Sequence, residues 1–253
     1  MKIITWNLKS STSSSKCWEI ILNHNIDICM LQDVKSIPNA IKHKYFIKSE
    51  YPTKKNLEKQ KFSTVCLIKK GIVFESVTFS LESIYLEKIY NSFLGNIVAL
   101  ELNDIVFINF YNPYWEIPKT LYDWSKIENI RLKNQTKLFL TEILYGIIST
   151  IDDKKIVIGG DFNHSIKFDE KRDDKFNSER FSRFNKLGIY DALSYKLKKP
   201  VPTFIDRNKK LIHQLDYMFV SEDFLNFGKS NVLEKDIIYN NSISDHLPIF
   251  FEF

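Results

Sequence analysis

Apolar runs of strand length recur along the whole chain, and most of them end on polar or charged residues. These residues are Asn7 after IITW, Asp33 after ICMLQ, Tyr111 and Asn112 after VFINF, Asp161 and Asn163 after IVIGG, Asp216 inside HQLDYMF, and Asp245 and His246 before the last run. A carboxylate at a buried strand end is costly unless it is paired or bound to a cation. Each residue alone has an ordinary structural explanation, such as a turn or a strand end, but their repetition indicates a common site.

The spacing of apolar residues predicts the elements that carry these strand ends. We expect strands at residues 2–8, 26–33, 62–71, 73–80, 155–165, 213–221 and 246–253, with a Gly-Gly turn at Gly159 and Gly160. Residues 96–113 contain two apolar runs separated by Asn103 and Asp104, which predicts a hairpin. Helices are expected at 16–23 and 129–150, and 168–181 is expected to be a loop or a polar helix. The chain is therefore predicted to alternate strands with helices.

Length and composition favour one domain. The chain has 253 residues, 44% of them hydrophobic, and no Gly/Ser/Pro-rich linker divides it, so we expect a single domain over residues 1–253. No apolar run approaches the roughly 18 residues of a membrane span. The N-terminal MKIITWNL lacks the apolar stretch and cleavage site of a secretory signal, and the three cysteines have no metal-type spacing. We expect reduced core thiols and a cytoplasmic, intracellular protein.

The net charge of +5 has two readings. Only five of the 36 basic residues are Arg, and the chain is also rich in Ile and Asn, which favours a scattered, solvated Lys surface. The same Lys side chains are also compatible with a polyanionic substrate, because Lys acts as a point charge toward phosphate. Charge alone therefore does not decide between these two interpretations.

Six short motifs occur in a fixed order along the chain. They are WN at Asn7, LQ followed by an acid at Asp33, Tyr-x-Pro at Tyr111, GDFN, LDY and SDHxP. With them the chain resembles the endonuclease/exonuclease/phosphatase superfamily, which includes AP endonucleases, pancreatic-type deoxyribonuclease, sphingomyelinases and inositol polyphosphate 5-phosphatases. The resemblance runs from Asn7 to Pro248. It implies an α/β fold in which a two-sheet β-sandwich is flanked by helices, the deoxyribonuclease-like four-layer sandwich.

The resemblance also implies hydrolysis of a phosphate ester with a divalent metal, most often Mg²⁺, with Mn²⁺ as a possible substitute. A hard cation with oxygen ligands stabilises the charge that grows on the leaving oxygen. By motif, Asp33 is the implied principal metal ligand, Asn7 lies close to the metal, and Asp245 reaches it through water. Asp161 is implied to orient or deprotonate the attacking water for in-line displacement, and Asn163 to bind that water or the phosphate.

The remaining motifs concern the phosphate. His246 is implied to donate hydrogen bonds to it, and Asp216 to fix the tautomer of His246 and support its charged form. Tyr111 is implied to contact the phosphate or the leaving oxygen. Three further residues near the motifs are candidates for substrate binding, namely Asn112, Phe204 and His213.

The chain departs from the motif pattern at a few positions. The second motif usually ends in Glu, and Asp33 is shorter by one methylene, which favours weaker Mg²⁺ binding or a preference for Mn²⁺. Tyr111 matches AP endonucleases, whereas deoxyribonuclease-like and sphingomyelinase-like members usually carry His there. His213 stands where AP endonucleases usually have an aromatic residue. The expected activity is therefore that of a nuclease on DNA, possibly also on RNA, without a commitment to abasic sites.

Two other functions remain open at this stage. One is a phosphatase or phosphodiesterase of a small molecule or phospholipid, of the inositol phosphate or sphingomyelinase type. The other is a non-catalytic binding protein on the same fold, which Asp33 alone favours. The charged residues of 165–183 are expected to form a solvated mixed-charge loop or to contact a nucleic-acid backbone, and the oligomeric state is left open.

Overall fold

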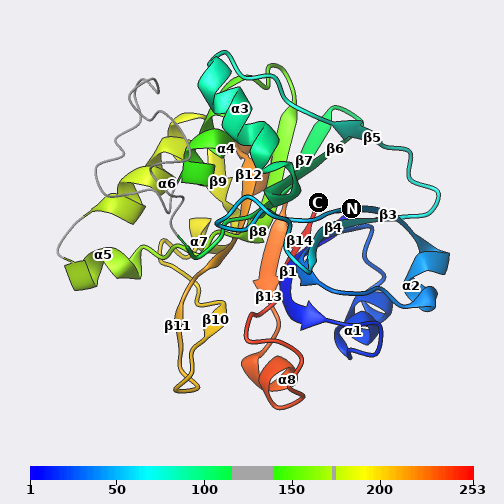
Figure 1. Cartoon of the computed structure of the whole chain (residues 1–253). Helices are drawn as coiled ribbons and strands as arrows, with labels where there is room; N and C mark the ends of the chain where they lie inside the picture. Colours follow the sequence, from blue (N-terminus) through cyan, green and yellow to red (C-terminus); the bar gives the residue numbers. More distant parts are fainter. Residues whose placement is uncertain (116–138, 173–174) are drawn as a thin grey trace.

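Two six-stranded β-sheets dominate the computed structural model, which describes residues 1–115, 139–172 and 175–253 (Figure 1). Sheet I has the strand order β13-β14-β1-β2-β4-β3, and sheet II the order β5-β6-β7-β8-β12-β9. The strands of sheet I are β1 (Lys2–Ser11), β2 (Ile28–Val34), β3 (Tyr45–Glu50), β4 (Ser63–Lys69), β13 (Lys229–Val232) and β14 (Ile249–Glu252). Those of sheet II are β5 (Glu75–Val77), β6 (Ile97–Leu102), β7 (Ile105–Tyr111), β8 (Lys155–Asp161), β9 (Ile189–Asp191) and β12 (Asp216–Ser221).

Each sheet contains one parallel pair of strands, at its centre. In sheet I the parallel pair is β1 with β2, and in sheet II it is β7 with β8, while the other pairs are antiparallel. The strands of a parallel pair end at the same edge of their sheet. Asn7 therefore lies opposite Gln32 in sheet I, and Tyr111 lies opposite Asp161 in sheet II.

Helices cover both outer faces of the two-sheet sandwich (Figure 1). One outer layer packs α1, α2 and α8 against sheet I, and the other packs α3, α4 and α6 against sheet II. The helices of the described part of the chain are α1 (Cys17–Asn23), α2 (Asn39–Lys44), α3 (Ile84–Ser92), α4 (Phe139–Ser149), α5 (Lys167–Arg172), α6 (Phe176–Lys186), α7 (Ala192–Tyr195) and α8 (Lys235–Tyr239). A short hairpin of β10 (Phe204–Ile205) and β11 (Leu211–His213) stands apart from both sheets. The four-layer sandwich expected from the sequence is confirmed.

The described residues form three buried apolar clusters, one between the two sheets and one between each sheet and its helices. Side chains alternate along each strand, so one set faces the opposite sheet and the other set faces the helices. Ile3, Met30, Phe107, Val157 and Met218 belong to the fully buried cluster between the sheets. The same alternation places Asn7, Tyr111, Asp161 and Asp216 on the inner faces, at the end of this core.

Gly159 and Gly160 lie inside β8, so the predicted Gly-Gly turn is wrong. A Cβ at Gly160 would lie 1.9 Å from the carbonyl oxygen of Phe110, and one at Gly159 would lie 2.4 Å from Cε of Met30. Glycine is needed here because β8 approaches its neighbouring strand and the opposite sheet too closely for a side chain. The Gly159-Gly160 pair is therefore explained by the close packing of β8 and not by a turn.

Several predicted element boundaries also change. The strand predicted at 73–80 is reduced to β5, and the strand predicted from 246 begins only at Ile249. Residues 245–247 pair instead with the segment at β10, where Ile205 N donates to the Asp245 carbonyl and Leu247 N to the Thr203 carbonyl. The predicted helix 129–150 is observed as α4 from Phe139, and its first part lies outside the described residues. The hairpin at Asn103 and Asp104 is confirmed.

The described residues of the segment 168–181 belong mostly to α5 and the start of α6, which confirms the polar-helix alternative of the prediction. Two of its charged residues are buried: Asp169, which accepts hydrogen bonds from Asn177 and Ser178, and Arg180, which pairs with Glu142 of α4. A mixed-charge sequence folds inward here because each buried charge meets a partner. The solvated loop expected from the sequence is therefore wrong for these two residues.

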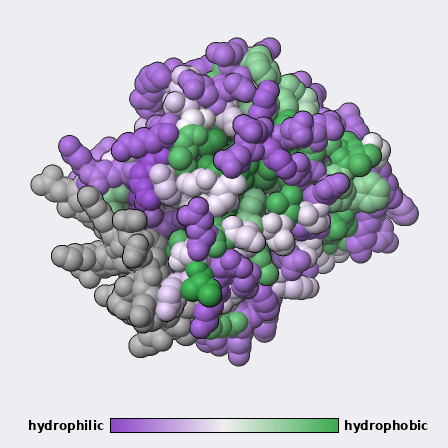
Figure 2. Space-filling model, turned by 90° about the horizontal axis from the view of Figure 1, so that it is seen from above, coloured by the Kyte–Doolittle hydropathy of each residue, from purple (hydrophilic) through white to green (hydrophobic). Residues whose placement is uncertain are grey.

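Cys17, Cys29 and Cys66 are buried free thiols, as the sequence predicted. The face shown in Figure 2 is mostly hydrophilic, with smaller hydrophobic patches between the polar side chains. Within the described ranges, no helix combines the length and apolar character that crossing a bilayer would take.

Candidate active site

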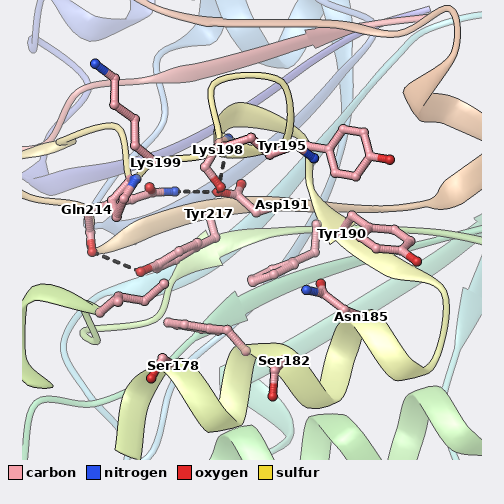
Figure 3. A pocket seen from close by; sticks show the side chains of 15 residues that line it. Ser178, Ser182, Asn185, Tyr190, Asp191, Tyr195, Lys198, Lys199, Gln214 and Tyr217 are labelled. Carbon is pink, nitrogen blue, oxygen red and sulfur yellow. Dashed lines mark hydrogen bonds between the residues drawn. The ribbon is translucent and has the colours of Figure 1, made fainter. Parts of the chain in front are cut away.

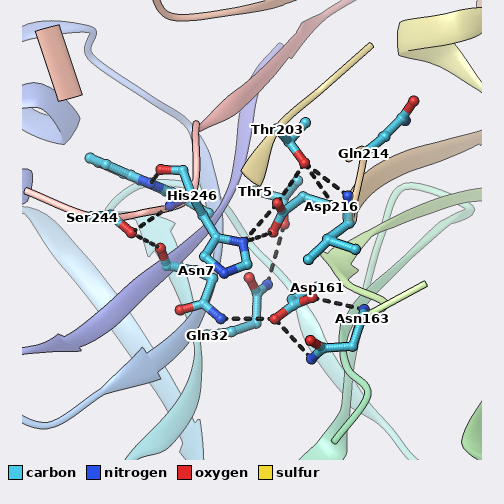
Figure 4. Close-up of polar contacts among 12 residues, drawn as sticks. Thr5, Asn7, Gln32, Asp161, Asn163, Thr203, Gln214, Asp216, Ser244 and His246 are labelled. Carbon is cyan, nitrogen blue, oxygen red and sulfur yellow. Dashed lines mark hydrogen bonds and ion pairs between the residues drawn. The ribbon is translucent and has the colours of Figure 1, made fainter. Parts of the chain in front are cut away.

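Polar side chains from strands of both sheets converge at the open end of the inter-sheet core (Figure 4). Asn7 comes from β1, Asp161 from β8, Asp216 from β12, and His246 from the segment before β14. Ligand-capable atoms of Asp161, Asp216 and His246 lie within 4.8 Å of one another, and all three residues are buried. We call these three residues the acid–imidazole cluster. The structure thus brings together residues that the sequence spreads over most of its length.

His246 is held by the Asp216 carboxylate. Its Nδ1 lies 2.8 Å from Oδ2 and 3.0 Å from Oδ1 of Asp216. Burial lowers the pKa of His246, but the charge and hydrogen bond of Asp216 outweigh it and raise that pKa to about 9. At neutral pH the imidazole is therefore protonated, and Nε2 is its remaining donor.

Thr203 supports this pair from behind. Its hydroxyl donates to Asp216 Oδ2 at 2.7 Å and accepts from the backbone N–H groups of Leu215 and Asp216, both at 3.0 Å. Ser244 fixes the other side, because its hydroxyl accepts from His246 N and donates to the Asn7 carbonyl. No role was predicted for Thr203 or Ser244, although Ser244 opens the SDHxP motif.

Asp161 is a buried carboxylate with three donors. Oδ2 accepts from Asn7 Nδ2 at 2.9 Å and from Asn163 Nδ2 at 3.1 Å, while Oδ1 accepts from Asn163 N at 2.9 Å. Burial raises the pKa of Asp161 to about 7; the Asp216 charge adds to this, and His246 opposes it. Oδ1 accepts only one of these hydrogen bonds, so it retains a lone pair for a water molecule. A carboxyl with such a pKa exchanges a proton near neutral pH.

Asp33 lies at the edge of this arrangement. Its Oδ1 accepts from the Ser10 hydroxyl at 2.8 Å, and its φ of 56° is in the left-handed region, where the regular alternation of β2 ends. Burial raises the pKa of Asp33, with Ser10, Lys35 and His246 acting in the opposite direction.

Tyr111 is the last residue of β7, opposite Asp161, and Asn112 follows it. Tyr111 is buried, and desolvation with the nearby Asp161 and Asp33 charges raises the pKa of its phenol, so it remains a donor. Asn112 is fully buried and donates to the Phe162 carbonyl at 2.9 Å, and its own carbonyl accepts from Asn163 Nδ2 at 2.7 Å. The structure therefore places Asn112 in support of the loop after Asp161.

The other candidates lie around the rim. Asp245 pairs with Lys9, with Oδ2 and Nζ 3.0 Å apart, so a lysine stands beside the carboxylate that was expected near the metal. The Phe204 ring lies 5.0 Å from the His246 ring, which places it at the cluster. His213 is half-buried, and its ring packs on Phe168 at 4.6 Å. Phe204 thus borders the cluster more closely than His213 does.

A polar bridge that sequence patterns did not reveal joins the two sheets beneath the cluster. Gln32 of β2 donates to Asn109 Oδ1 of β7 at 2.7 Å, and Asn109 Nδ2 donates to the carbonyls of Leu31 and Val65. Both side chains are fully buried. Gln32 was read only as part of a motif, and Asn109 only as part of an apolar strand, because their partners are remote in sequence.

The oxygen donors at this end of the core fit a hard divalent cation. The available groups are the carboxylates of Asp33 and Asp161 and the amide oxygen of Asn7, a donor type that Mg²⁺ and Mn²⁺ prefer. The raised pKa values of both carboxyls come from desolvation, which a bound cation would offset. Asp216 and His246 are already engaged with each other. The residues present therefore agree with the expected metal.

Comparison with known proteins identifies the family and agrees with the fold. Residues 105–250 match the family model described as endonuclease-reverse transcriptase. No curated protein matches the sequence. An AP endonuclease from Archaeoglobus fulgidus has the same fold, with a TM-score of 0.69 and 20% identity over 100% of this chain and 99% of that one.

Two further solved structures share the fold. The 3′ phosphatase NExo from Neisseria, bound to a product DNA hairpin, superposes with a TM-score of 0.67 and 21% identity, covering 100% of this chain and 99% of that one. The endonuclease domain of TRAS1, a telomere-specific non-LTR retrotransposon, has a TM-score of 0.60 and 15% identity, covering 100% and 97%. At these identities the structures establish the fold alone.

Proposed function

The chain belongs to the endonuclease-reverse transcriptase family of the endonuclease/exonuclease/phosphatase superfamily, and on this premise we propose that it is a divalent-metal-dependent phosphodiesterase that cleaves DNA. The observation that carries the proposal is the acid–imidazole cluster, in which one protonated imidazole and one carboxylate of near-neutral pKa lie side by side. We propose DNA as the substrate because proteins with the same fold include an AP endonuclease and a 3′ phosphatase bound to a DNA hairpin.

Each residue has a definite part in this reaction. Protonated His246 donates from Nε2 to a phosphoryl oxygen, while Asp216 keeps Nδ1 occupied and the ring charged. Asp161 accepts the proton of the attacking water at Oδ1, the oxygen with spare hydrogen-bonding capacity. Tyr111 donates to the leaving oxygen or to the phosphate, because its raised pKa keeps the phenol protonated.

We assign the metal to Asp33 and Asn7, with Asp161 next to it. A bound Mg²⁺ or Mn²⁺ would supply charge stabilisation for the phosphoryl group and its leaving oxygen. Asn163 and Asn7 hold Asp161 by donating to Oδ2, so the carboxylate is oriented whether or not it is ionised. Asp245 keeps the role of a water-mediated ligand only as a prediction, since Lys9 is its partner in the structure.

The proposal also covers the context of the activity. Residues 1–253 are proposed to act as one domain, supported by a core that both sheets share. The intracellular location stays a prediction, supported by three free thiols. The same chemistry applies to RNA, which is the second candidate polymer.

A cleavage assay tests the proposal. Purified chain is incubated with plasmid, nicked, abasic and single-stranded DNA in Mg²⁺ or Mn²⁺, and with a chelator as control. We expect metal-dependent cleavage, and we expect His246→Ala and Asp161→Asn each to lower kcat/KM by about 10²–10⁴-fold. His43 is exposed on α2, so His43→Ala is the matched control and is expected to retain full activity.

The alternatives are separate outcomes of the same assay. Hydrolysis of an inositol phosphate or a phospholipid, with all nucleic acids left intact, would replace the proposal by a small-molecule phosphoesterase. DNA binding without turnover of any of these substrates, unchanged by His246→Ala, would identify a binding protein on this fold.

A further inference from the structure

A cavity of about 360 Å³ lies beside α6, outside the acid–imidazole cluster (Figure 3). Its lining comes from α6, β9, α7 and the turn after α7, and includes Asn185, Tyr190, Asp191, Tyr195, Lys198 and Lys199. The volume lies within the range of pockets that bind small molecules. None of the roles proposed above for hydrolysis uses these residues.

Two tyrosine rings give the cavity an aromatic wall. Tyr190 and Tyr195 are only partly buried, and their ring centroids lie 5.3 Å apart at an angle of 69°. The ammonium group of Lys198 lies 4.1 Å from the centroid of the Tyr195 ring. Partly exposed aromatic rings that line a pocket offer stacking surface for a flat, unsaturated ligand.

Positive charge and an amide complete the lining. Lys198 and Lys199 are exposed, and neither forms an ion pair with any described residue, so both are available to an anion. Asn185 makes no side-chain hydrogen bond within the described ranges, and Figure 3 places its amide beside Tyr190. An amide presents one acceptor and two donor hydrogens, which suits the edge of a nucleobase.

A shared segment connects the cavity with the acid–imidazole cluster. Gln214 lines the cavity, where its Nε2 donates to Asp191 Oδ2 at 2.8 Å and its Oε1 accepts from Val201 N at 2.8 Å. Asp216, two residues later, holds His246. Two residues span at most about 7 Å of backbone, so the two sites lie near each other along β12. The cavity is on the helix-covered face of sheet II, with Tyr217 and Phe219 in its lining, whereas Asp216 is on the inner face.

We propose that this cavity is a binding site for one nucleotide unit. The base stacks on Tyr195 and meets Tyr190 at an angle, because the two rings lie at 69° to each other. Its edge faces Asn185, and the phosphate contacts Lys198 and Lys199. The choice of a nucleotide over other anionic aromatic ligands rests on the proposed function, because a DNA-cleaving chain handles nucleotides as substrate and product. The unit is either a free mononucleotide or an unpaired nucleotide of the substrate strand.

Binding is measured without catalysis, in a chelator, by calorimetry and by amide chemical shifts with dAMP as the probe. We expect shifts at Tyr190–Lys199 and an affinity that Tyr195→Ala lowers by about 5- to 100-fold, the range for loss of a base–aromatic stack. The double variant Lys198→Ala and Lys199→Ala is expected to weaken binding at least about 5-fold, since each lysine contributes charge-assisted contacts to phosphate. Tyr51→Ala and Lys42→Ala, at exposed positions elsewhere, are matched controls expected to bind as the unchanged chain does.

Other probes separate the sources of the nucleotide and test the assignment. If a duplex with a single-stranded tail binds more tightly than a blunt duplex, and Tyr195→Ala removes the difference, the bound nucleotide belongs to the substrate strand. If dAMP binds but the two duplexes bind equally, the site takes a free nucleotide. The proposal is overturned if dAMP does not bind, if ribose 5-phosphate binds equally well, or if the cavity variants bind normally. A chain that binds dAMP here but hydrolyses no DNA would reject the proposed function and leave this site in place.

Discussion

The proton on the His246 imidazole depends mainly on the Asp216 carboxylate, with smaller contributions from Asp161 and Asp245. Burial lowers the pKa of His246, and Asp216 raises it to about 9. Because this value exceeds the ordinary pKa of about 6.5, the protonated ring contributes stability that is complete below pH 6.5 and is lost as the pH rises through about 9. An NMR titration of the metal-free chain is expected to show His246 half-protonated near pH 9.

Substitution of the partner provides the control for this titration. Asp216→Asn removes the raising charge and leaves the burial, so the His246 midpoint is expected to fall below the ordinary value of about 6.5. His43→Ala is expected to leave the midpoint where it was. If the titration midpoint of His246 were unchanged in Asp216→Asn, another group would be keeping the ring charged.

Asp33 is the residue at which the chain departs from the motif it otherwise matches. Its φ of 56° is tolerated by Asp better than by longer side chains. We expect Asp33→Glu to lower the free energy of unfolding by no more than about 1–2 kcal/mol and to tighten Mn²⁺ binding, because the added methylene extends the carboxylate. Asp33→Asn is expected to weaken Mn²⁺ binding at least tenfold in calorimetry. Equal affinities in all three chains would remove Asp33 from the metal site.

At the scale of elements, β8 depends on its two glycines. A Cβ at Gly160 would meet the Phe110 carbonyl oxygen at 1.9 Å, and a backbone atom of a paired strand cannot move aside locally. We expect Gly160→Ala to lower the free energy of unfolding by about 1–3 kcal/mol or more in chemical denaturation, and to lower activity because Asp161 follows directly.

Gly146 is the matched control for that substitution. It lies within α4, where the nearest side-chain atom to an added Cβ, from Leu81, is 3.8 Å away. Gly146→Ala is expected to raise the free energy of unfolding by roughly 0.5–1 kcal/mol, the usual gain in a helix interior. If Gly160→Ala were as harmless as Gly146→Ala, the close approach of β7 and β8 would be wrong.

For the whole molecule, the free energy of unfolding depends on pH and on bound metal through the buried carboxyl groups at the end of the inter-sheet core. Burial raises the pKa of Asp161 to about 7, above its ordinary 3.8, so its contribution to stability is highest below about pH 4 and is lost as the pH rises through 7. A cation bound there offsets the cost of the ionised form. We therefore expect Mg²⁺ to raise the Tm by a large amount at pH values above 7 and by only a small amount near pH 5.

The check on this prediction is a Tm series at several pH values, with Mg²⁺ and with a chelator. Asp161→Asn is expected to abolish most of the difference between the two series above pH 7. A Mg²⁺ effect that is equal at pH 5 and pH 8, or that survives Asp161→Asn, would place the cation elsewhere.

The sequence by itself determined most of the strands that carry the polar residues, because apolar runs of strand length are a local property of the chain. The two-sheet sandwich and the residues that meet in the acid–imidazole cluster were predicted through the six motifs, by resemblance to a known superfamily. Alternation also accounts for Asn7, Tyr111, Asp161 and Asp216 facing the same inter-sheet space.

Only the tertiary structure decided how remote segments meet. The contact of Gly160 with Phe110, the pairing of Asp245 with Lys9, and the Gln32–Asn109 bridge each join residues far apart in sequence. The same holds for the cavity beside α6, whose lining comes from several separate elements. Such contacts depend on the distance between packed sheets and helices, which local patterns of apolar residues do not encode.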